Sequence, residues 1–347
     1  MIISRTPYRV SLFGGGTDYP KWYLQHGGAV LGMAIDKYCY ISVRHLPPFF
    51  EHKHRVVYSL VEDVKRIEDI RHPAVRAVMQ ELKIDVGLEI HHDGDLPARS
   101  GLGSSSSFTV GLINALYALR GQMVTKRFLA QEAIRIEQSV IKENVGSQDQ
   151  IWAAFGGFNR IDFSPDGSFA VSPVIAPQER EELLIDHLML FFTGFSRQAS
   201  EIAKDKIANL DKRQGHLLRM AAMVDDAQAV LSDRRRPITD IGRLLHEGWS
   251  LKRELANAVS TAAIDDIYQA GIEAGAIGGK VIGAGGGGFI LFFVEPAKQQ
   301  AVRERLRRLV EVEVDIAPSG SAIVVYEPGD FRDHHHRRSH ASDGTPS

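Results

Sequence analysis

Residues 95 to 116 read DLPARSGLGSSSSFTVGLINAL, with a Gly-Leu-Gly turn and four serines directly before an apolar stretch with helical spacing. Gly101 and Gly103 allow backbone conformations that other residues avoid, and the helix that follows points unpaired N–H groups back at the turn. Such a turn binds anions. One serine would be enough to cap the helix, so four serines favour a ligand with phosphate oxygens or a hard cation. The predicted phosphate-binding residues are Gly101, Leu102, Gly103, Ser104, Ser105 and Ser106.

Composition restricts the chain to one large globular domain or two ordinary ones. It has 347 residues, 44% of them apolar, enough to fill a sizeable core. Lys and Arg total 41 against 43 Asp and Glu, so no overall positive field exists to hold nucleic acid or an anionic membrane surface.

The only cysteine and the N-terminus indicate where the protein resides. Cys39 cannot form an internal disulfide, and we expect a buried, unreactive thiol in a reducing compartment. Arg5 and Arg9 interrupt the one apolar stretch that could be a signal peptide, and no run approaches about 18 apolar residues. We therefore expect a cytoplasmic protein that does not enter a membrane.

The order of strand-like and helix-like segments predicts an α+β fold in two parts. The first half contains the strand-like runs RVSLFGG, AVLGMAIDKYCYISVRH, RVVYSL and VGLEIHHD, followed by helices from about residue 104 to 154. The pattern restarts at the strand-like HLMLFF, after two prolines and an acidic cluster. We therefore place a domain boundary near residue 180, with domains at 1–180 and 181–330.

The order of strands and helices in the second half is that of a known type of domain. After HLMLFF come helices from about residue 198 to 275, the strands GGKVIGAG and FILFFVE, the helix AKQQAVRERLRRLVEV and the strand SAIVVYE. This β-α-β-β-α-β order is that of ferredoxin-like domains. The tail at 331–347 has almost no apolar residues, and we expect it to be disordered; its HHHRR could bind a metal, but a solvated charged tail is the favoured interpretation.

Two more glycine-rich loops stand at strand ends. KVIGAGGGGFILFF, residues 280–293, has the letters of a dinucleotide fingerprint, but a strand follows it where that fingerprint requires a helix. Its five glycines indicate either a flexible hairpin or backbone that closely approaches a ligand or another loop.

PYRVSLFGGGTDYP, residues 7–20, ends a strand in three glycines, Thr17 and Asp18. A hydroxyl and a carboxylate at a rigid strand end suit recognition of a polyol. The alternative is a turn in which the Asp side chain satisfies its own backbone.

Together and in this order, the three loops resemble those of the GHMP small-molecule kinases, named for galactokinase, homoserine kinase, mevalonate kinase and phosphomevalonate kinase. PARSGLGSSSS is similar to the family's phosphate-binding signature, and GAGGGGF to its C-terminal glycine motif. The resemblance spans the folded chain. It implies an N-terminal domain like ribosomal protein S5 domain 2, a ferredoxin-like C-terminal domain, and an active site between them that uses ATP and Mg²⁺.

The resemblance also assigns catalytic residues within IEQSVIKENVGSQDQIWAAFGG, residues 136–157. Glu137 matches the helix carboxylate that binds Mg²⁺ in sugar-kinase members, with Ser105 as the second ligand. Asp149 matches the carboxylate that faces the phosphoryl acceptor, either as base or as electrostatic orienter. Arg9 matches an arginine beside that carboxylate, which would offset charge on the transferring group. From the residues alone, Glu137 would be a solvated helix residue, Asp149 a helix cap and Arg9 a surface residue of an edge strand.

The acceptor is also inferred from the resemblance. Galactokinases have Glu-His-Thr-Asp-Tyr where this chain has GGGTDY, which disfavours galactose. FGGGTDYP and FFTGFSRQAS are more similar to the bacterial D-glycero-D-manno-heptose 7-phosphate kinases, with fucokinase-like enzymes next. The implied reaction phosphorylates the anomeric hydroxyl. The predicted substrate-binding residues are Gly16, Thr17, Asp18, Arg197, Gly285 and Gly286.

A phosphorylated acceptor needs cations of its own. Arg197 is our first choice for the 7-phosphate, with Arg99 and Lys37 behind it. Arg99 lies beside the phosphate loop, where it could serve ATP instead. Arg197 could equally be a surface residue at the start of a helix.

Other classes of function make different demands on the sequence. An idle sugar sensor on the same scaffold should lose the base or the metal carboxylate, and this chain keeps Asp149 and Glu137. ATP turnover without sugar would indicate an ATPase-like interaction protein. A basic stripe on one face would reopen nucleic-acid binding. The expected partner is a small sugar phosphate, with no nucleic acid and no membrane, and a homodimer is compatible with the sequence.

Overall fold

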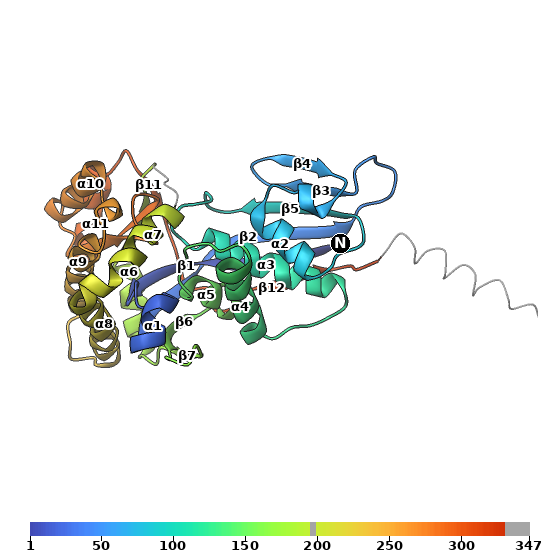
Figure 1. The fold of residues 1–347 in the computed structure, drawn as a ribbon. Helices are drawn as coiled ribbons and strands as arrows, with labels where there is room; N and C mark the ends of the chain where they lie inside the picture. The colour runs from blue at the N-terminus through green and yellow to red at the C-terminus, as the bar shows by residue number, and fades with distance from the viewer. Residues whose placement is uncertain (195–198, 330–347) are drawn as a thin grey trace, which may run out of the picture.

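Two β-sheets organise the computed structural model, which describes residues 1–194 and 199–329 (Figure 1). The strands of the larger sheet are β1 (Ile2–Phe13), β2 (Gly28–His45), β3 (His54–Val57), β4 (Val61–Val64), β5 (Leu88–Gly94), β6 (Phe158–Phe163), β7 (Phe169–Pro173) and β12 (Ala322–Tyr326). Those of the smaller sheet are β8 (Leu188–Phe192), β9 (Gly278–Val281), β10 (Phe289–Phe293) and β11 (Val310–Val312).

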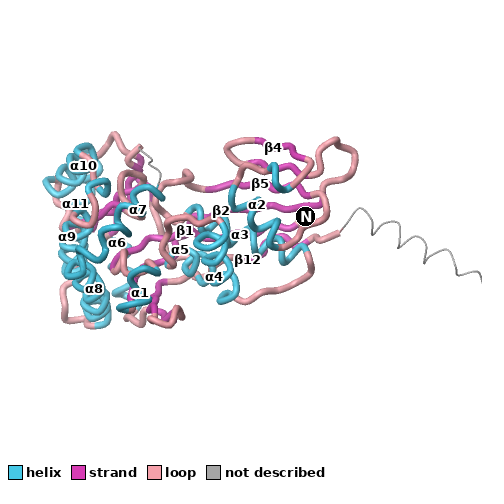
Figure 2. The backbone as a smooth tube through the Cα atoms, viewed as in Figure 1, coloured by secondary structure: helices cyan, strands magenta, loops and turns pink. Residues whose placement is uncertain are grey.

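The helices lie around the two sheets and are drawn in cyan in Figure 2. Those before residue 187 are α1 (Pro20–His26), α2 (Pro73–Glu81), α3 (Ser104–Leu119), α4 (Lys126–Arg135), α5 (Gln148–Phe155) and α6 (Gln178–Asp186). Those after it are α7 (Ala199–Asn209), α8 (Gln214–Ser232), α9 (Thr239–Arg253), α10 (Ala262–Glu273) and α11 (Pro296–Arg305). Short 3₁₀ turns lie at Ile67–Asp69, Leu210–Arg213 and Asn257–Val259, and a π-helical turn at Ile136–Val140.

The larger sheet is built on a long antiparallel pair, β1 and β2, with Ile2 opposite Val43 and Phe13 opposite Leu31. Its order is β12-β1-β2-β5-β3-β4, and β6 also pairs with β2 and carries β7. Helix α3 packs on both β1 and β2. The last eight residues of β1 are all buried, and the strand runs directly into the glycines that follow Phe13. A rigid, buried strand therefore delivers the first glycine loop.

One predicted strand lies in the other sheet. The sequence order predicted that SAIVVYE closes the ferredoxin-like sheet, but β12 pairs antiparallel with β1. The smaller sheet is closed by β11, which pairs with β8 and which the predicted helix AKQQAVRERLRRLVEV had included. Val310 and Val312 are β-branched and favour a strand. We therefore propose a C-terminal domain that ends near residue 312 instead of 330, after which the chain returns to the larger sheet.

Two other expectations concern the core and the ends of the chain. Cys39 is fully buried, and burial raises the pKa of its thiol, as an unreactive core cysteine requires. Within the part of the chain that the structure describes, no helix combines the length and the apolar character needed to cross a membrane. The predicted tail, 331–347, lies outside the described residues.

Candidate active site

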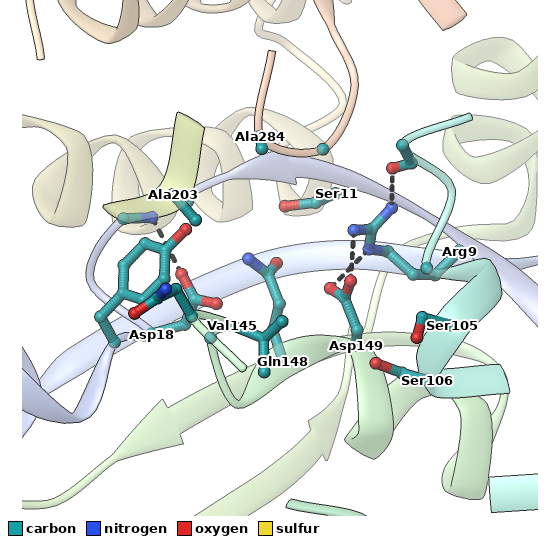
Figure 3. A pocket seen from close by; sticks show the side chains of 18 of the residues that line it. Arg9, Ser11, Asp18, Ser105, Ser106, Val145, Gln148, Asp149, Ala203 and Ala284 are labelled. Carbon is teal, nitrogen blue, oxygen red and sulfur yellow. Dashed lines mark hydrogen bonds and ion pairs between the residues drawn. The ribbon is translucent and has the colours of Figure 1, made fainter. Parts of the chain in front are cut away.

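A cavity of about 390 Å³ lies where the three glycine loops meet (Figure 3). Both halves of the chain contribute charged side chains to its walls. Arg9, Asp18 and Asp149 come from the first half, and Lys252 and Lys280 come from the second. The cavity thus joins segments far apart in the sequence.

The predicted phosphate loop opens helix α3 on the cavity wall. Gly103 has φ +76° and is the N-cap of α3, and no side chain caps the first turn. The serine hydroxyls have other roles: Ser104 Oγ accepts a hydrogen bond from the N–H of Arg99 at 3.1 Å, and Ser107 Oγ donates to a backbone carbonyl of β1 at 2.8 Å. Ser105 is exposed and lines the cavity. The N-terminal N–H groups of α3 are therefore available for an anion.

Arg9 and Asp149 form a two-pronged ion pair beside this loop (Figure 3). Arg9 Nε donates to Asp149 Oδ1 at 2.8 Å, and Arg9 Nη2 donates to Asp149 Oδ2 at 2.6 Å. The third arm of the guanidinium, Nη1, donates to the carbonyl of Gly101. A Cβ placed on Gly103 would lie 3.5 Å from Asp149 Oδ2 and 3.2 Å from Arg9 Cγ. The ion pair and the anion loop are thus in contact.

The packing of α5 fixes the position of Asp149. Asp149 is in the first turn of α5, and Trp152, one turn further on, is fully buried. A Cβ on Gly32 of β2 would lie 2.9 Å from Trp152 Cζ2, so the indole lies directly on the sheet. The alternative interpretation had Asp149 as a cap of its own helix, but both oxygens of its carboxylate accept hydrogen bonds from Arg9. The carboxylate thus links helix α5 to strand β1, and this link limits its movement.

Glu137 lies buried in the π-helical turn, beside α3. Its Oε2 accepts hydrogen bonds from Ser106 Oγ at 2.9 Å and from Gln150 Nε2 at 2.5 Å; its Oε1 has no hydrogen-bond partner among the described residues. A buried carboxylate oxygen without a partner, next to a serine hydroxyl, suits a hard divalent cation. The serine that contacts Glu137 is Ser106, whereas Ser105, the predicted metal ligand, is exposed and lines the cavity.

Replacing Glu137 with glutamine is expected to change how stability depends on pH. Burial raises the pKa of Glu137 to about 7 from its ordinary 4.5. Between these values the unfolded chain releases the proton and the folded chain keeps it, so this group destabilises the fold as pH rises. Without divalent cations, the stability of Glu137→Gln relative to wild type should increase by roughly 3 kcal/mol from pH 4.5 to pH 8. Urea unfolding across this range measures the difference, and a constant difference would contradict burial as its cause.

The C-terminal glycine loop packs directly on the phosphate loop. Gly283 has φ +74°, and a Cβ on it would lie 2.6 Å from both the Cα and the carbonyl oxygen of Gly101. A Cβ on Gly288 would lie 2.1 Å from the carbonyl oxygen of Ser100, which also accepts a hydrogen bond from the N–H of Phe289 at 3.1 Å. Of the two interpretations of these glycines, the close approach of backbone to another loop is confirmed.

Two residues of this loop, Gly285 and Gly286, are not among those that line the cavity. Gly285 and Gly286 were predicted to bind substrate, but they pack against Val259, whose carbonyl accepts the N–H of Gly286 at 2.8 Å. Gly283 and Ala284 line the cavity instead. Both glycines have positive φ angles, +106° and +77°.

Of the three predicted residues of the N-terminal glycine loop, two line the cavity and one is structural. Thr17 is fully buried, with its Oγ1 2.8 Å from the carbonyl oxygen of Gly14 and 2.9 Å from that of Ala29. Backbone groups occupy its hydroxyl, and Thr17 is not among the residues that line the cavity. Asp18 and Gly16 line the cavity, and Asp18 Oδ1 also accepts the N–H of Gly16 at 2.9 Å.

The predicted phosphate-contacting cations have different positions. Arg197 lies outside the described residues. Lys37 forms an ion pair with Asp36 at 2.9 Å and is not part of the cavity wall. Arg99 lines the cavity beside Ser104, where it suits the nucleotide loop.

Two buried lysines on the wall were missed by sequence reasoning. Lys280 Nζ donates to the carbonyl of Leu12 at 2.7 Å, and Lys252 Nζ donates to those of Val281 and Gly283 at 2.7 Å. A charged residue within the buried strand GGKV was the signal for Lys280. Nothing in the helical sequence around Lys252 distinguishes it from a surface lysine.

Comparison with known proteins supports a family assignment. The model of the GHMP kinases N terminal domain matches residues 67–157, and that of the GHMP kinases C terminal domain matches residues 227–312. A D-glycero-alpha-D-manno-heptose 7-phosphate kinase from Campylobacter jejuni is 29% identical, over 88% of this chain and 93% of that relative. A bifunctional fucokinase/GDP-fucose pyrophosphorylase from Arabidopsis thaliana is 26% identical, over 89% of this chain and 31% of that longer relative.

A solved structure shares the fold. The crystal structure of a D-glycero-D-manno-heptose 1-phosphate kinase from Bacteroides thetaiotaomicron has a TM-score of 0.70 and 22% sequence identity, covering 94% of this chain and all of that one. The α+β fold predicted from the resemblance is therefore confirmed. The two family matches together span just over half of the chain, in the order in which the glycine loops occur. The chain belongs to the GHMP kinase family and is a phosphotransferase.

Proposed function

We propose that this kinase transfers the γ-phosphoryl group of ATP to the anomeric hydroxyl of D-glycero-D-manno-heptose 7-phosphate. The product would be the 1,7-bisphosphate, used to make nucleotide-activated heptose for surface polysaccharide. One observation carries the proposal: the ion pair of Arg9 and Asp149 lies against Gly103, the residue that opens the anion-binding turn of α3. A proton acceptor, a guanidinium and a phosphate site thus meet in one cavity.

Asp149 would act on the attacking hydroxyl. Its carboxylate accepts the proton of the anomeric hydroxyl as that oxygen bonds to the γ-phosphorus, and the bond from the γ-phosphorus to the bridging oxygen breaks to release ADP. An anomeric hydroxyl is more acidic than an ordinary alcohol, so a modest base is enough. Arg9 orients the carboxylate with two hydrogen bonds, and its charge offsets that of the transferring group.

Glu137 and Ser106 are the residues that would hold Mg²⁺. When bound, the ion supplies positive charge to the β and γ phosphates. The described residues include no group of three or more His, Cys, Asp or Glu side chains able to hold a metal ion. We therefore expect nucleotide oxygens to complete the coordination of an ion that Glu137 and Ser106 anchor.

The acceptor would lie on the side of Asp149 that faces Asp18 (Figure 3). Lys252 and Lys280, both buried and both on the cavity wall, are the cations that we propose for the 7-phosphate, in addition to Arg197. Their hydrogen bonds to backbone carbonyls fix the position of each ammonium group on the cavity wall. The similarity to the Campylobacter jejuni kinase supports the choice of a heptose phosphate.

A panel of acceptors tests the substrate. ADP release with ATP and Mg²⁺ is measured on D-glycero-D-manno-heptose 7-phosphate, the unphosphorylated heptose, mannose, L-fucose and galactose, with the new phosphate located by NMR. We expect the heptose 7-phosphate to give the highest kcat/KM, with phosphate on C1. Preference for an unphosphorylated sugar would keep the chemistry of Asp149 but reject the phosphate-binding role of Lys252 and Lys280.

A fucokinase-like activity is the second candidate, favoured by the similarity to the fucokinase part of the Arabidopsis thaliana protein. It makes the opposite prediction in the same panel. L-fucose should then exceed both heptoses in kcat/KM, and Lys280→Met should leave turnover of L-fucose within a few-fold of wild type.

A further inference from the structure

Two polar side chains on the cavity wall are buried, and each has one oxygen atom without a hydrogen-bond partner among the described residues. Ser11, from β1, is 5% exposed, and Gln148, from α5, is 9% exposed. Ser11 Oγ and Gln148 Oε1 have no hydrogen-bond partner among the residues that the structure describes. A buried polar atom without a partner is destabilising, so natural proteins seldom keep one without a ligand or a water for it. Neither residue has a role in the proposed transfer step.

The two side chains border the same small space, next to Gly15. A Cβ placed on Gly15 would lie 3.8 Å from Ser11 Oγ and 4.0 Å from Gln148 Nε2, with no heavy atom outside its chain neighbours closer. Gly15 has no positive φ, so its backbone would accept a side chain. The absence of a side chain at Gly15 keeps this part of the cavity open. Figure 3 shows Gln148 between Asp18 and Asp149, with Ser11 above it in this view.

The chemistry of this space suits a neutral group that both donates and accepts hydrogen bonds. Ser11 offers a hydroxyl, and Gln148 offers a carbonyl oxygen and an amide nitrogen. None of these atoms is charged, so they would compensate an anion poorly compared with the lysines elsewhere on the wall. A sugar hydroxyl matches both partners, because it can donate to Gln148 Oε1 and accept from Ser11 Oγ.

We propose that Ser11, Gly15 and Gln148 form a hydroxyl-binding subsite that holds the C2 hydroxyl of the acceptor sugar. Gln148 and Asp149 line the same cavity, with the Gln148 side chain beside Asp149 in Figure 3, so a hydroxyl held by Gln148 would neighbour the one that Asp149 deprotonates. This inference rests on the proposed sugar kinase activity and adds its specificity. The subsite positions the anomeric hydroxyl by holding the adjacent carbon, and it selects against sugars that lack a C2 hydroxyl.

The pairing is tested by removing either the protein's polar group, in a variant, or the sugar's C2 hydroxyl, in a 2-deoxy analogue. The kcat/KM of wild type, Ser11→Ala and Gln148→Leu is measured on D-glycero-D-manno-heptose 7-phosphate and on its 2-deoxy analogue, or on the panel's best sugar and its 2-deoxy analogue. Each variant should lose about 10- to 100-fold on the hydroxylated sugar and less than about 3-fold on the analogue, with KM for ATP unchanged. Equal losses on both sugars would overturn the assignment.

Gly15→Ala tests the space itself. The added methyl group fills the subsite without backbone strain, so KM for the sugar should rise at least about tenfold while KM for ATP stays within about twofold. Gly215→Ala is the matched control, since no atom lies within 4 Å of its Cβ position. An unchanged KM for the sugar in Gly15→Ala would overturn the proposal.

Calorimetry of sugar binding without ATP separates the two levels of inference. A wild-type protein that binds the hydroxylated sugar more tightly than the 2-deoxy analogue, but does not phosphorylate it, contradicts the proposed function and supports the subsite. A protein that phosphorylates both sugars equally well supports the function and overturns the subsite. A protein that binds neither sugar contradicts both.

Discussion

Asp149→Asn is expected to lower kcat by about 10²- to 10⁴-fold, the range associated with loss of a positioned general base. Asparagine has the same shape and keeps one hydrogen-bond acceptor for Arg9, but it cannot take the proton of the sugar hydroxyl. It also removes the negative charge that pairs with a buried guanidinium. KM for ATP should change by less than about threefold, since the α3 turn remains. Steady-state kinetics at saturating ATP and sugar measure both constants.

Asp162→Asn is a matched control for this variant. Asp162 also accepts two hydrogen bonds from one arginine, from Arg160 Nε at 2.8 and 3.0 Å, but it is not part of the cavity wall. We expect its kcat to equal that of wild type. If Asp149→Asn keeps more than about one third of the wild-type kcat, Asp149 serves as an electrostatic orienter, because loose phosphoryl transfer needs little help from a base.

Local chemistry made the phosphate turn and the contact between glycine loops predictable. The conformations of Gly101 and Gly103 are read correctly from the sequence, because glycine is favoured at their positive φ angles. The glycines from 283 to 288 were excluded from a dinucleotide fold by the strand after them, which left close backbone approach as one of two interpretations. Gly101 against Gly283 is that approach. Such positions are predictable because the backbone alone determines the residue type.

Features that depend on long-range pairing were not predictable in the same way. β12 has the composition of any strand, and its partner is β1, more than 300 residues away. Ser105 and Ser106 differ only by one step around α3, which turns one to the exposed side and the other to Glu137. The π-helical turn that carries Glu137 has no signal in the sequence pattern. The neutral pair of Ser11 and Gln148 becomes visible only when β1 and α5 face one cavity.

Gly283→Ala is expected to weaken ATP binding at least about tenfold and to lower the free energy of unfolding. A left-handed conformation costs alanine roughly 1–3 kcal/mol, and the new methyl group would overlap the backbone of Gly101 at 2.6 Å, which cannot move aside as a side chain can. The phosphate loop would be displaced by the loop that supports it.

Gly121→Ala separates strain from displacement. Gly121 has φ +71°, and the nearest atom to its Cβ position is a side-chain oxygen at 4.0 Å, so alanine there suffers the strain without the overlap. Urea unfolding and calorimetric titration with ATP compare the two variants. Both should lose stability, but only Gly283→Ala should lose ATP affinity, because only Gly283 touches the turn of α3. Equal ATP affinities would mean that the phosphate loop holds its shape without the C-terminal glycine loop.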